Sequence, residues 1–421
     1  MKHSEALVLG AGMQGALSAL MLANRGLTVT LIDRADAMLQ GSSLNYEGRI
    51  HSGMLYAMDK TFNTATRMAK DAVAFAPAIE RILGMKLDWA RLRSVRSTYL
   101  VHRNSHLSAD ELTAFWTQLE HVIMAELEDP EMTYVGARPK RFFWPTDCPE
   151  EAKAGIVTHA FKSEETCVDQ VSLNAIVKAA VNAHPRIVCA LGQEVLTVEG
   201  RGADRYTVTT SDGQGARTQH QAGLVVNCLW EARGLIDRVM GISDGSTESL
   251  RLKYSLLLKR SEYFDRLGSF ILTHGAFGSV VTSPFADTAF ASWYPACVEG
   301  MIETQQLPDH WRALCSGPVP DHIRDRVLAE NVAGFREVFP DFPMPEVKLI
   351  KAGIIVAHGL RDIDKTDSGF HRRDEYPIRR KGNYLSVATG KYTSIGRNVL
   401  RLESELFDKA TERPTAAAMT V

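Results

Sequence analysis

The sequence predicts an α/β fold with two interleaved lobes, one built on a parallel sheet and one on a mostly antiparallel sheet. Three features predict it. The chain opens with an apolar strand, a glycine-rich turn and a helix; residues 251–300 are rich in short strands; and further apolar strands return at 222–229 and 383–390. A chain of 421 residues, 45% of them hydrophobic, is long enough to bury a core in each of two lobes.

Charge and cysteine content exclude several classes of protein. The 48 basic and 50 acidic residues nearly cancel, so nothing indicates a nucleic-acid partner or a membrane surface. The six cysteines are scattered and form no C-x-x-C pair, so we expect no metal site, and reduced thiols in a cytoplasmic protein. Residues 6–23 carry no charge, but three glycines interrupt them, so we expect no membrane-spanning segment.

The N-terminal segment is predicted to form a β-α-β unit. A strand is expected over 5–9, and apolar residues recur at helical spacing over 13–25 until Gly26 ends the helix. The stretch 28–34 is rich in β-branched residues, which favour a second strand, and it closes on Asp33. An acid at the tip of the second strand is the context that a dinucleotide-binding turn requires.

The turn between the first strand and the helix has the spacing G-x-G-x-x-G of a Rossmann-type nucleotide site. Gly10 would make the tight turn, Gly12 would let the backbone approach a pyrophosphate, and Gly15 would let helix and strand pack closely. The helix start supplies free N–H groups to the phosphates, and Asp33 would accept a hydrogen bond from a ribose. An ordinary strand-turn-helix is the alternative, and the turn alone does not separate NAD from FAD.

Hydrophobic periodicity predicts the remaining elements. Helices are expected over 63–84, 108–127, 171–183, 322–338 and 394–410. Strands are expected over 187–200, 205–213, 222–229, 254–260, 268–273, 278–284, 288–295, 346–357 and 383–390. The region between the first two helices is mixed and polar, and no element is predicted there.

Three segments resemble a known family. The stretch "GSSLNYEGRIHSGMLY" at 41–56 is similar to the region after the second strand in the D-amino-acid-oxidase-like flavoprotein superfamily, above all its glycerol-3-phosphate dehydrogenase and 2-hydroxyglutarate oxidase branches. The matching residues are Ser42, Ser43, Ile50, His51 and Gly53. The segments 223–241 and 352–394 extend the resemblance, and "ATGKYT" within the second is close to the family's "GGKxTT".

The resemblance implies FAD as the cofactor and a Rossmann-type FAD-binding lobe with an interleaved α+β substrate lobe built on a mostly antiparallel sheet. The FAD-binding lobe would comprise 1–60, 150–250 and 345–410, the substrate lobe 61–149 and 251–344, and 411–421 would be a flexible tail. The residues expected to bind FAD are Gly10, Gly12, Met13, Gln14, Gly15, Asp33, Arg34, Ser42, Ser43, Asn45, His51, Val195, Gly390, Lys391, Tyr392 and Thr393.

Five residues are candidates for catalysis. His51 has a side chain suited to accept a proton at neutral pH, although a structural role or a covalent link to the flavin is open. Lys391 would stabilise the anionic N1/C2=O edge of reduced flavin, unless it is a solvated surface lysine. One of Arg372 and Arg373 would clamp a carboxylate, unless both lie on an exposed hairpin, and Tyr56 would bind the same anion or pack in the core.

The chain departs from the family pattern at several positions. Leu55 and the pair at 354–355 stand where glycerol-3-phosphate dehydrogenases have arginines, which argues against glycerol 3-phosphate as the substrate. Leu229 and Trp230 stand at the end of the strand at 222–229, where the family has a glycine. In the strand-rich region His274, Trp293 and Tyr294 are expected to pack more than to bind, and Cys228 is expected to be a small buried hydrophobe.

The sequence therefore predicts an FAD-dependent oxidoreductase, either oxidase or dehydrogenase. It would take a hydride from a C–N or C–OH carbon of a small, carboxylate-bearing substrate and pass the electrons to O2 or a redox partner. The alternatives are an NAD-dependent dehydrogenase, which the segments 41–56 and 386–394 oppose, and a non-catalytic flavin-binding protein. The identity of the substrate, the flavin attachment, the oligomeric state and the role of 61–149 stay open.

Overall fold

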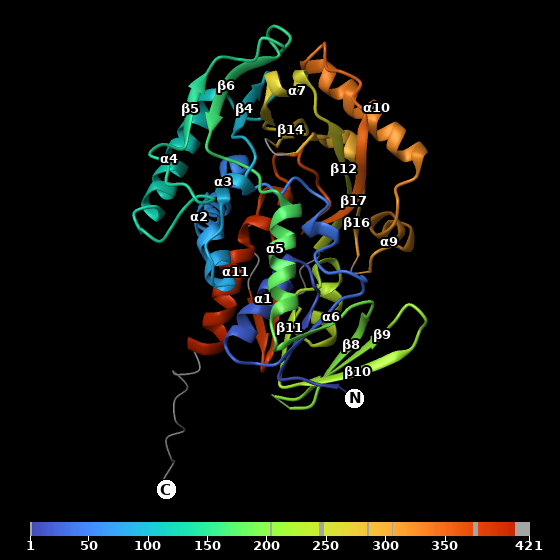
Figure 1. Cartoon of the computed structure of the whole chain (residues 1–421). Helices are drawn as coiled ribbons and strands as arrows, with labels where there is room; N and C mark the ends of the chain where they lie inside the picture. The colour runs from blue at the N-terminus through green and yellow to red at the C-terminus, as the bar shows by residue number, and fades with distance from the viewer. Residues whose placement is uncertain are drawn as a thin grey trace.

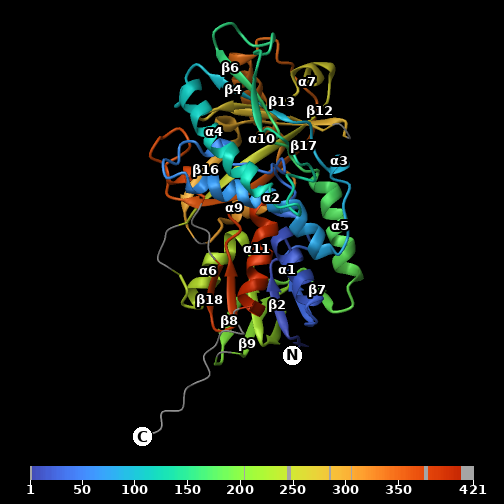
Figure 2. The same cartoon turned by 90° about the vertical axis from the view of Figure 1, so that its left-hand side faces the viewer.

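Three sheets organise the computed structural model (Figures 1 and 2). The structure describes residues 2–202, 204–243, 248–283, 286–304, 306–373 and 378–408. The predicted tail at 411–421 lies outside these ranges. Within them, no helix is both apolar and long enough to cross a membrane.

A six-stranded sheet forms the nucleotide-binding core. Its strand order is β18-β19-β11-β2-β3-β7, and every pair is parallel except the antiparallel pair β18·β19. The strands are β2 (Ala6–Leu9), β3 (Val29–Ile32), β7 (Ile187–Ala190), β11 (Leu224–Asn227), β18 (Ile378–Lys381) and β19 (Tyr384–Val387). Every residue of β2, β3, β11 and β19 is buried, which is typical of parallel strands covered on both faces.

Alternate residues of these strands contribute to two hydrophobic cores, one on each face of the sheet, because side chains in a strand point to opposite faces. Ala6 and Val8 face a helical layer, whereas Leu7 and Leu9 face the small sheet. The helical layer contains α1 (Met13–Asn24), α2 (Asn63–Leu83), α5 (Gln170–Ala183) and α11 (Ile395–Glu403). The other face carries β1 (Lys2–His3), β8 (Glu194–Gly200), β9 (Tyr206–Ser211), β10 (Arg217–Ala222) and α6 (Arg233–Val239).

A large, mostly antiparallel sheet forms the other half of the molecule (Figure 1). Its order is β16-β12-β15-β14-β13-β4-β6-β5, β17 pairs with β12, and only β13·β4 is parallel. Its strands are β4 (Ser97–His102), β5 (Phe143–Thr146), β6 (Val157–Ser163), β12 (Glu248–Lys259), β13 (Ser269–Thr273), β14 (Gly278–Thr282), β15 (Thr288–Trp293), β16 (Val298–Glu303) and β17 (Val347–His358).

Helices and short 3-10 turns cover this sheet and connect it to the first. The α-helices are α3 (Trp89–Leu92), α4 (Ala109–Glu126), α7 (Glu262–Leu267), α8 (Tyr294–Cys297), α9 (Asp309–Ser316) and α10 (Asp321–Val338). The 3-10 turns are η1 (Gly41–Ser43), η2 (Met54–Tyr56), η3 (Trp230–Ala232), η4 (Gly369–His371) and η5 (Tyr392–Ser394). A capping box between Ser108 and Glu111 fixes the start of α4.

The structure departs from the predicted elements in several places. The strand expected over 187–200 is two strands in different sheets, because the chain turns at Gly192 with φ +66°. The polar region between α2 and α4 contains β4, and the last helix ends as a π-turn over Ser404–Asp408. Both β6 and β17 pair in the large sheet, although their residues were assigned to the FAD-binding lobe. The lobe boundaries themselves stay a prediction.

Candidate functional site

Packing requires Gly10 and Gly15 in the N-terminal turn and leaves little space at Gly12. Gly10 has φ +94°, and a Cβ there would lie 2.6 Å from the carbonyl oxygen of Cys228. A Cβ on Gly15 would lie 1.8 Å from the carbonyl oxygen of Gly10. A Cβ on Gly12 would come within 3.2 Å of Ser43 Oγ. The turn therefore leaves its backbone bare beside Ser43, as the close approach of a pyrophosphate requires.

The start of α1 is open to an anion. Gly12 caps the helix without a side-chain hydrogen bond, and its first turn has no acidic residue. The Met13 amide donates to Ser43 Oγ at 2.9 Å. Within the described part of the chain, the amides of Gly12, Gln14 and Gly15 find no acceptor. Unpaired N–H groups at a helix start form a site for phosphate.

Asp33 holds this turn from the end of β3. Its Oδ2 accepts a hydrogen bond from the Ala11 amide at 2.6 Å, and its Oδ1 accepts one from the Ala35 amide at 2.8 Å. A carboxylate keeps further lone pairs, so a ribose contact stays a prediction. Arg34 is exposed and forms an ion pair with Glu231 at 2.6 Å.

Several other predicted FAD ligands have structural contacts. The side chains of Met13 and Gln14 are buried on α1, so contact with a cofactor is left to their backbone. Ser42 Oγ donates to the Ile354 carbonyl, and Asn45 Nδ2 donates to the Ala352 carbonyl at 2.7 Å, which ties this segment to β17. Val195 lies on β8 and packs against the core beneath the small sheet.

The His51 turn and the 390–393 segment lie against each other. The His51 amide donates to Thr393 Oγ1 at 2.7 Å, and Gly390 adopts φ +71° directly before Lys391. The imidazole meets Tyr56 edge to face, with ring centroids 5.7 Å apart. His51 Nδ1 and the Tyr392 hydroxyl are both buried, and neither has a hydrogen-bond partner in the described structure. Two segments 342 residues apart thus build one site.

Positive charge gathers around His51. Burial, together with the charges of Lys391 and Arg49, holds the pKa of His51 well below its usual value, so the imidazole is neutral at pH 7. Burial, together with the charge of Arg373, lowers the pKa of Lys391 to about 7. Lys253 is a further positive neighbour of both groups.

Two lysines in this cluster contact no anion within the described residues. Among the described residues, the ammonium groups of Lys391 and Lys253 form neither a hydrogen bond nor an ion pair; the Lys253 Nζ lies 5.8 Å from the ring centroid of Tyr294. The charge of Glu47 acts on both lysines. Burial raises the pKa of Glu47, but the charges of Lys253, Arg49 and Lys391 and a backbone hydrogen bond together lower it. The cluster is consequently suited to receive an anion.

The two arginines that were candidates for binding a carboxylate differ in burial. Arg372 is exposed, whereas Arg373 is 1% exposed and its guanidinium stacks on Phe370 at 4.4 Å. Arg373 Nη1 donates to the Val356 carbonyl at 3.0 Å, and its amide donates to Thr64 Oγ1. The charge of Arg373 therefore acts on the His51 cluster.

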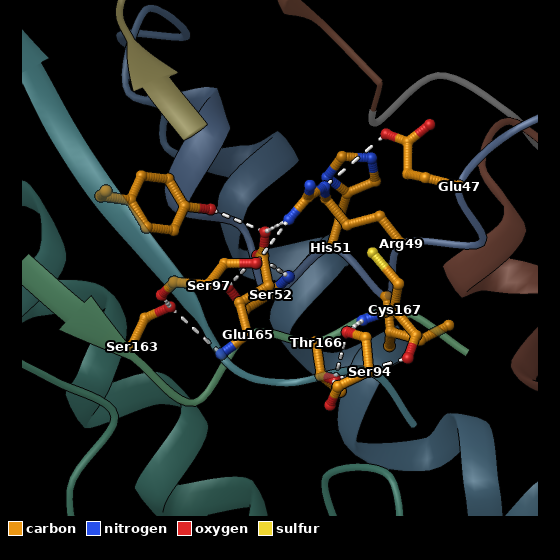
Figure 3. Close-up of polar contacts among 12 residues, drawn as sticks. Glu47, Arg49, His51, Ser52, Ser94, Ser97, Ser163, Glu165, Thr166 and Cys167 are labelled. Atoms are coloured by element: carbon orange, nitrogen blue, oxygen red, sulfur yellow. Dashed lines mark hydrogen bonds and ion pairs between the residues drawn. The ribbon is translucent and has the colours of Figure 1, made fainter. Parts of the chain in front are cut away.

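Sequence reasoning missed a buried charge network beneath His51, which Figure 3 shows. Arg49 Nη1 donates to Ser97 Oγ at 3.0 Å and lies 3.6 Å from Glu165 Oε1. Arg49 Nε lies 3.6 Å from Glu47 Oε1. The spacing R-I-H was an available signal, because residues 49 and 51 are alternate residues of one segment. No local pattern indicated the partner of this segment, Glu165, which lies more than 100 residues away along the chain.

The candidate residues of the strand-rich region mostly pack in the hydrophobic core. Trp293 meets Phe335 edge to face at 5.3 Å in the second core, and His274 is buried. Tyr294 instead donates its hydroxyl proton to Asp362 at 2.7 Å. Cys228 is buried, as predicted, and burial raises the pKa of its thiol to about 12. In the described ranges, no group of metal-ligating side chains is assembled.

Known proteins resemble this chain in sequence family and in fold. Residues 5–390 match the family described as FAD dependent oxidoreductase. No curated protein matches the chain. A dithionite-reduced L-alpha-glycerophosphate oxidase from Mycoplasma pneumoniae with FAD bound is 13% identical, with a TM-score of 0.64, and the alignment covers 96% of this chain and 95% of that one.

Two further solved structures share the fold. A glycine oxidase from Geobacillus kaustophilus is 13% identical with a TM-score of 0.63, over 100% of this chain and 98% of that one. An L-proline dehydrogenase from P. horikoshii is 13% identical with a TM-score of 0.60, over 98% and 96%. Each alignment spans nearly both chains, so the whole fold is shared.

Proposed function

Because the chain belongs to the FAD-dependent oxidoreductase family, we propose that it oxidises a C–N or C–OH carbon of a small substrate that bears a carboxylate. The cofactor, when bound, supplies the acceptor for a hydride. The two electrons then pass to O2 or to a redox partner. The observation that supports the proposal best is the pair of half-buried lysines beside a neutral imidazole, neither of which forms an ion pair with a described residue.

The residues present fit FAD. The bare turn at Gly12 and the open start of α1 suit a pyrophosphate, with the Ser43 hydroxyl beside them. Asp33 lies at the end of the neighbouring strand, where a ribose binds in this type of site. Lys391 and the buried His51 Nδ1, which has no hydrogen-bond partner among the described residues, are left for the flavin ring and the substrate.

We assign one anion to Lys391 and a different anion to Lys253 and Arg373. Lys391 follows Gly390 directly before η5, so it is placed to hold negative charge on the reduced ring. Lys253 comes from β12 in the large sheet, and Arg373 follows η4, so these two would bind the carboxylate of the substrate. Neither assignment involves the positions at which glycerol-3-phosphate dehydrogenases carry arginines.

His51 would move the proton. A hydride leaves a carbon most readily when the attached hydroxyl or ammonium group gives up its proton. The imidazole is neutral at pH 7, because burial and the surrounding cations lower its pKa, so it has a free lone pair to accept that proton. The anchored amide at Thr393 fixes where the ring lies.

An anaerobic bleaching screen tests the proposal. The holoenzyme is mixed with amino acids, N-alkyl amino acids, 2-hydroxy acids and glycerol 3-phosphate, and its flavin absorbance is followed. Glycerol 3-phosphate belongs in the screen because one similar structure is a glycerophosphate oxidase. We expect bleaching by at least one carboxylate. Bleaching by glycerol 3-phosphate alone, or by no compound, would contradict the proposed substrate class.

A further inference from the structure

Glu165 is a buried carboxylate that the proposed reaction does not use. Its side chain is 0% exposed, and it lies on the segment between β6 and α5. The Ser52 amide donates to its Oε2 at 2.8 Å, and the Ser52 hydroxyl donates to the same atom at 2.6 Å. The Tyr99 hydroxyl donates to Oε1 at 2.7 Å, and Arg49 Nη1 lies 3.6 Å from that oxygen (Figure 3).

These contacts fix the residue next to His51. The amides of His51 and Ser52 are consecutive, and they donate to different elements: Thr393 before α11 and Glu165 after β6. The following residue, Gly53, adopts φ +110°, and a Cβ there would lie 2.7 Å from the Ala65 carbonyl oxygen. The turn that carries the imidazole is therefore held from both sides and cannot shift freely.

The network also balances the positive charge of the buried Arg49. Arg49 is 2% exposed in its side chain, and its Nη2 is buried without a hydrogen-bond partner in the described structure. Figure 3 shows its guanidinium beside the His51 ring. The carboxylates of Glu165 and Glu47 balance its charge from 3.6 Å each. Burying an ion pair costs about as much as it gains, so stability alone does not explain this one.

We propose that Glu165 is a positioning residue for the reaction: it anchors the His51–Ser52 turn and balances the charge of Arg49 beneath the flavin site. The inference rests on the proposed function. It divides into a geometric part, which depends on the reach of the side chain to Ser52, and an electrostatic part, which depends on its negative charge. Two substitutions separate the parts, because Gln keeps the reach and Asp keeps the charge.

The test measures the flavin midpoint potential and the rate of anaerobic flavin reduction in the holoenzyme. For Glu165→Gln we expect a more positive potential, because Glu47 alone then balances the charge of Arg49, and the less balanced charge favours an anionic reduced ring. For Glu165→Asp we expect the wild-type potential but reduction slowed about tenfold, the loss that about 1.4 kcal/mol of transition-state stabilisation produces. Tyr99→Phe is the matched control: it removes one hydrogen bond to the same carboxylate and should keep the potential.

Two further variants keep the test decisive if Glu165→Gln does not fold. Arg49→Met should move the potential in the negative direction, and Ser52→Ala should slow reduction without moving it. Wild-type potentials in every folded charge variant would overturn the electrostatic part. Wild-type rates in Glu165→Asp and Ser52→Ala would overturn the geometric part. The potential is measured with dithionite and needs no substrate, so a failed bleaching screen would leave this result readable.

Discussion

Replacing Lys391 by Met removes one positive charge at the predicted edge of the reduced flavin. The ammonium is half-buried and forms no ion pair in the described structure, so no contacting anion neutralises its charge. Loss of one preorganised charge in a water-poor site costs roughly 2.7–4 kcal/mol, or about 10²–10³ in rate. We therefore expect Lys391→Met to bind FAD normally and to reduce it about 10²–10³ times more slowly.

The pH dependence makes the prediction more specific. Burial lowers the pKa of Lys391 to about 7, so the free enzyme loses this positive charge as the pH rises through that value. The reduction rate at low substrate concentration should consequently fall above pH 7, because this regime reports groups of the free enzyme. Lys391→Arg is the matched control: a guanidinium stays charged, so the fall should disappear while most of the rate remains.

Stopped-flow reduction by a substrate from the bleaching screen is the assay. The reasoning would be refuted if Lys391→Met reduced its flavin at the wild-type rate. It would also be refuted if the fall above pH 7 persisted unchanged in Lys391→Met, since the titrating group would then be another residue.

Three further predictions follow from the same site. Gly12→Val should abolish flavin retention, because any Cβ comes within 3.2 Å of Ser43 Oγ and fills the bare turn; a purified variant with one flavin per chain would refute this placement. Lys253→Met should raise KM for a carboxylate substrate about tenfold or more with a smaller effect on kcat, whereas Lys259→Met, on the exposed end of the same strand, should change neither; equal effects of both would contradict the assignment. His51→Ala should slow reduction, and the wild-type acid limb should lie below pH 6.5, because burial and the neighbouring cations lower the pKa of His51; an acid limb above pH 6.5 that His51→Ala leaves unchanged would exclude His51 as the base.

The parts of the fold that local sequence determines were predictable. The β-α-β unit from Ala6 to Ile32 follows from apolar spacing and from glycines whose positions leave no room for a side chain. The sheet membership of β17 was not predictable, because its partner strand lies far away in sequence. Strand β17 looks like any apolar strand and pairs with β12, a hundred residues earlier.

The candidate site divides in the same way. His51 and Lys391 carry a recognisable local pattern, and their segments do meet through Thr393. The choice between Arg372 and Arg373 depended on which of two adjacent side chains faces inward, and only the structure gives that. Glu165 and Lys253 stand in segments without a motif, so their place beside His51 depends on tertiary packing alone.

The central claim is that the cluster of cations around His51 selects a carboxylate substrate. The most direct measurement compares anaerobic flavin reduction by one substrate acid and by its uncharged amide, in the wild-type holoenzyme. The account predicts rapid bleaching by the acid and reduction by the amide that is slower by about 10² or more, since a charged hydrogen bond contributes roughly 1.5–3 kcal/mol and more than one cation is available. Equal rates for the acid and the amide would contradict it.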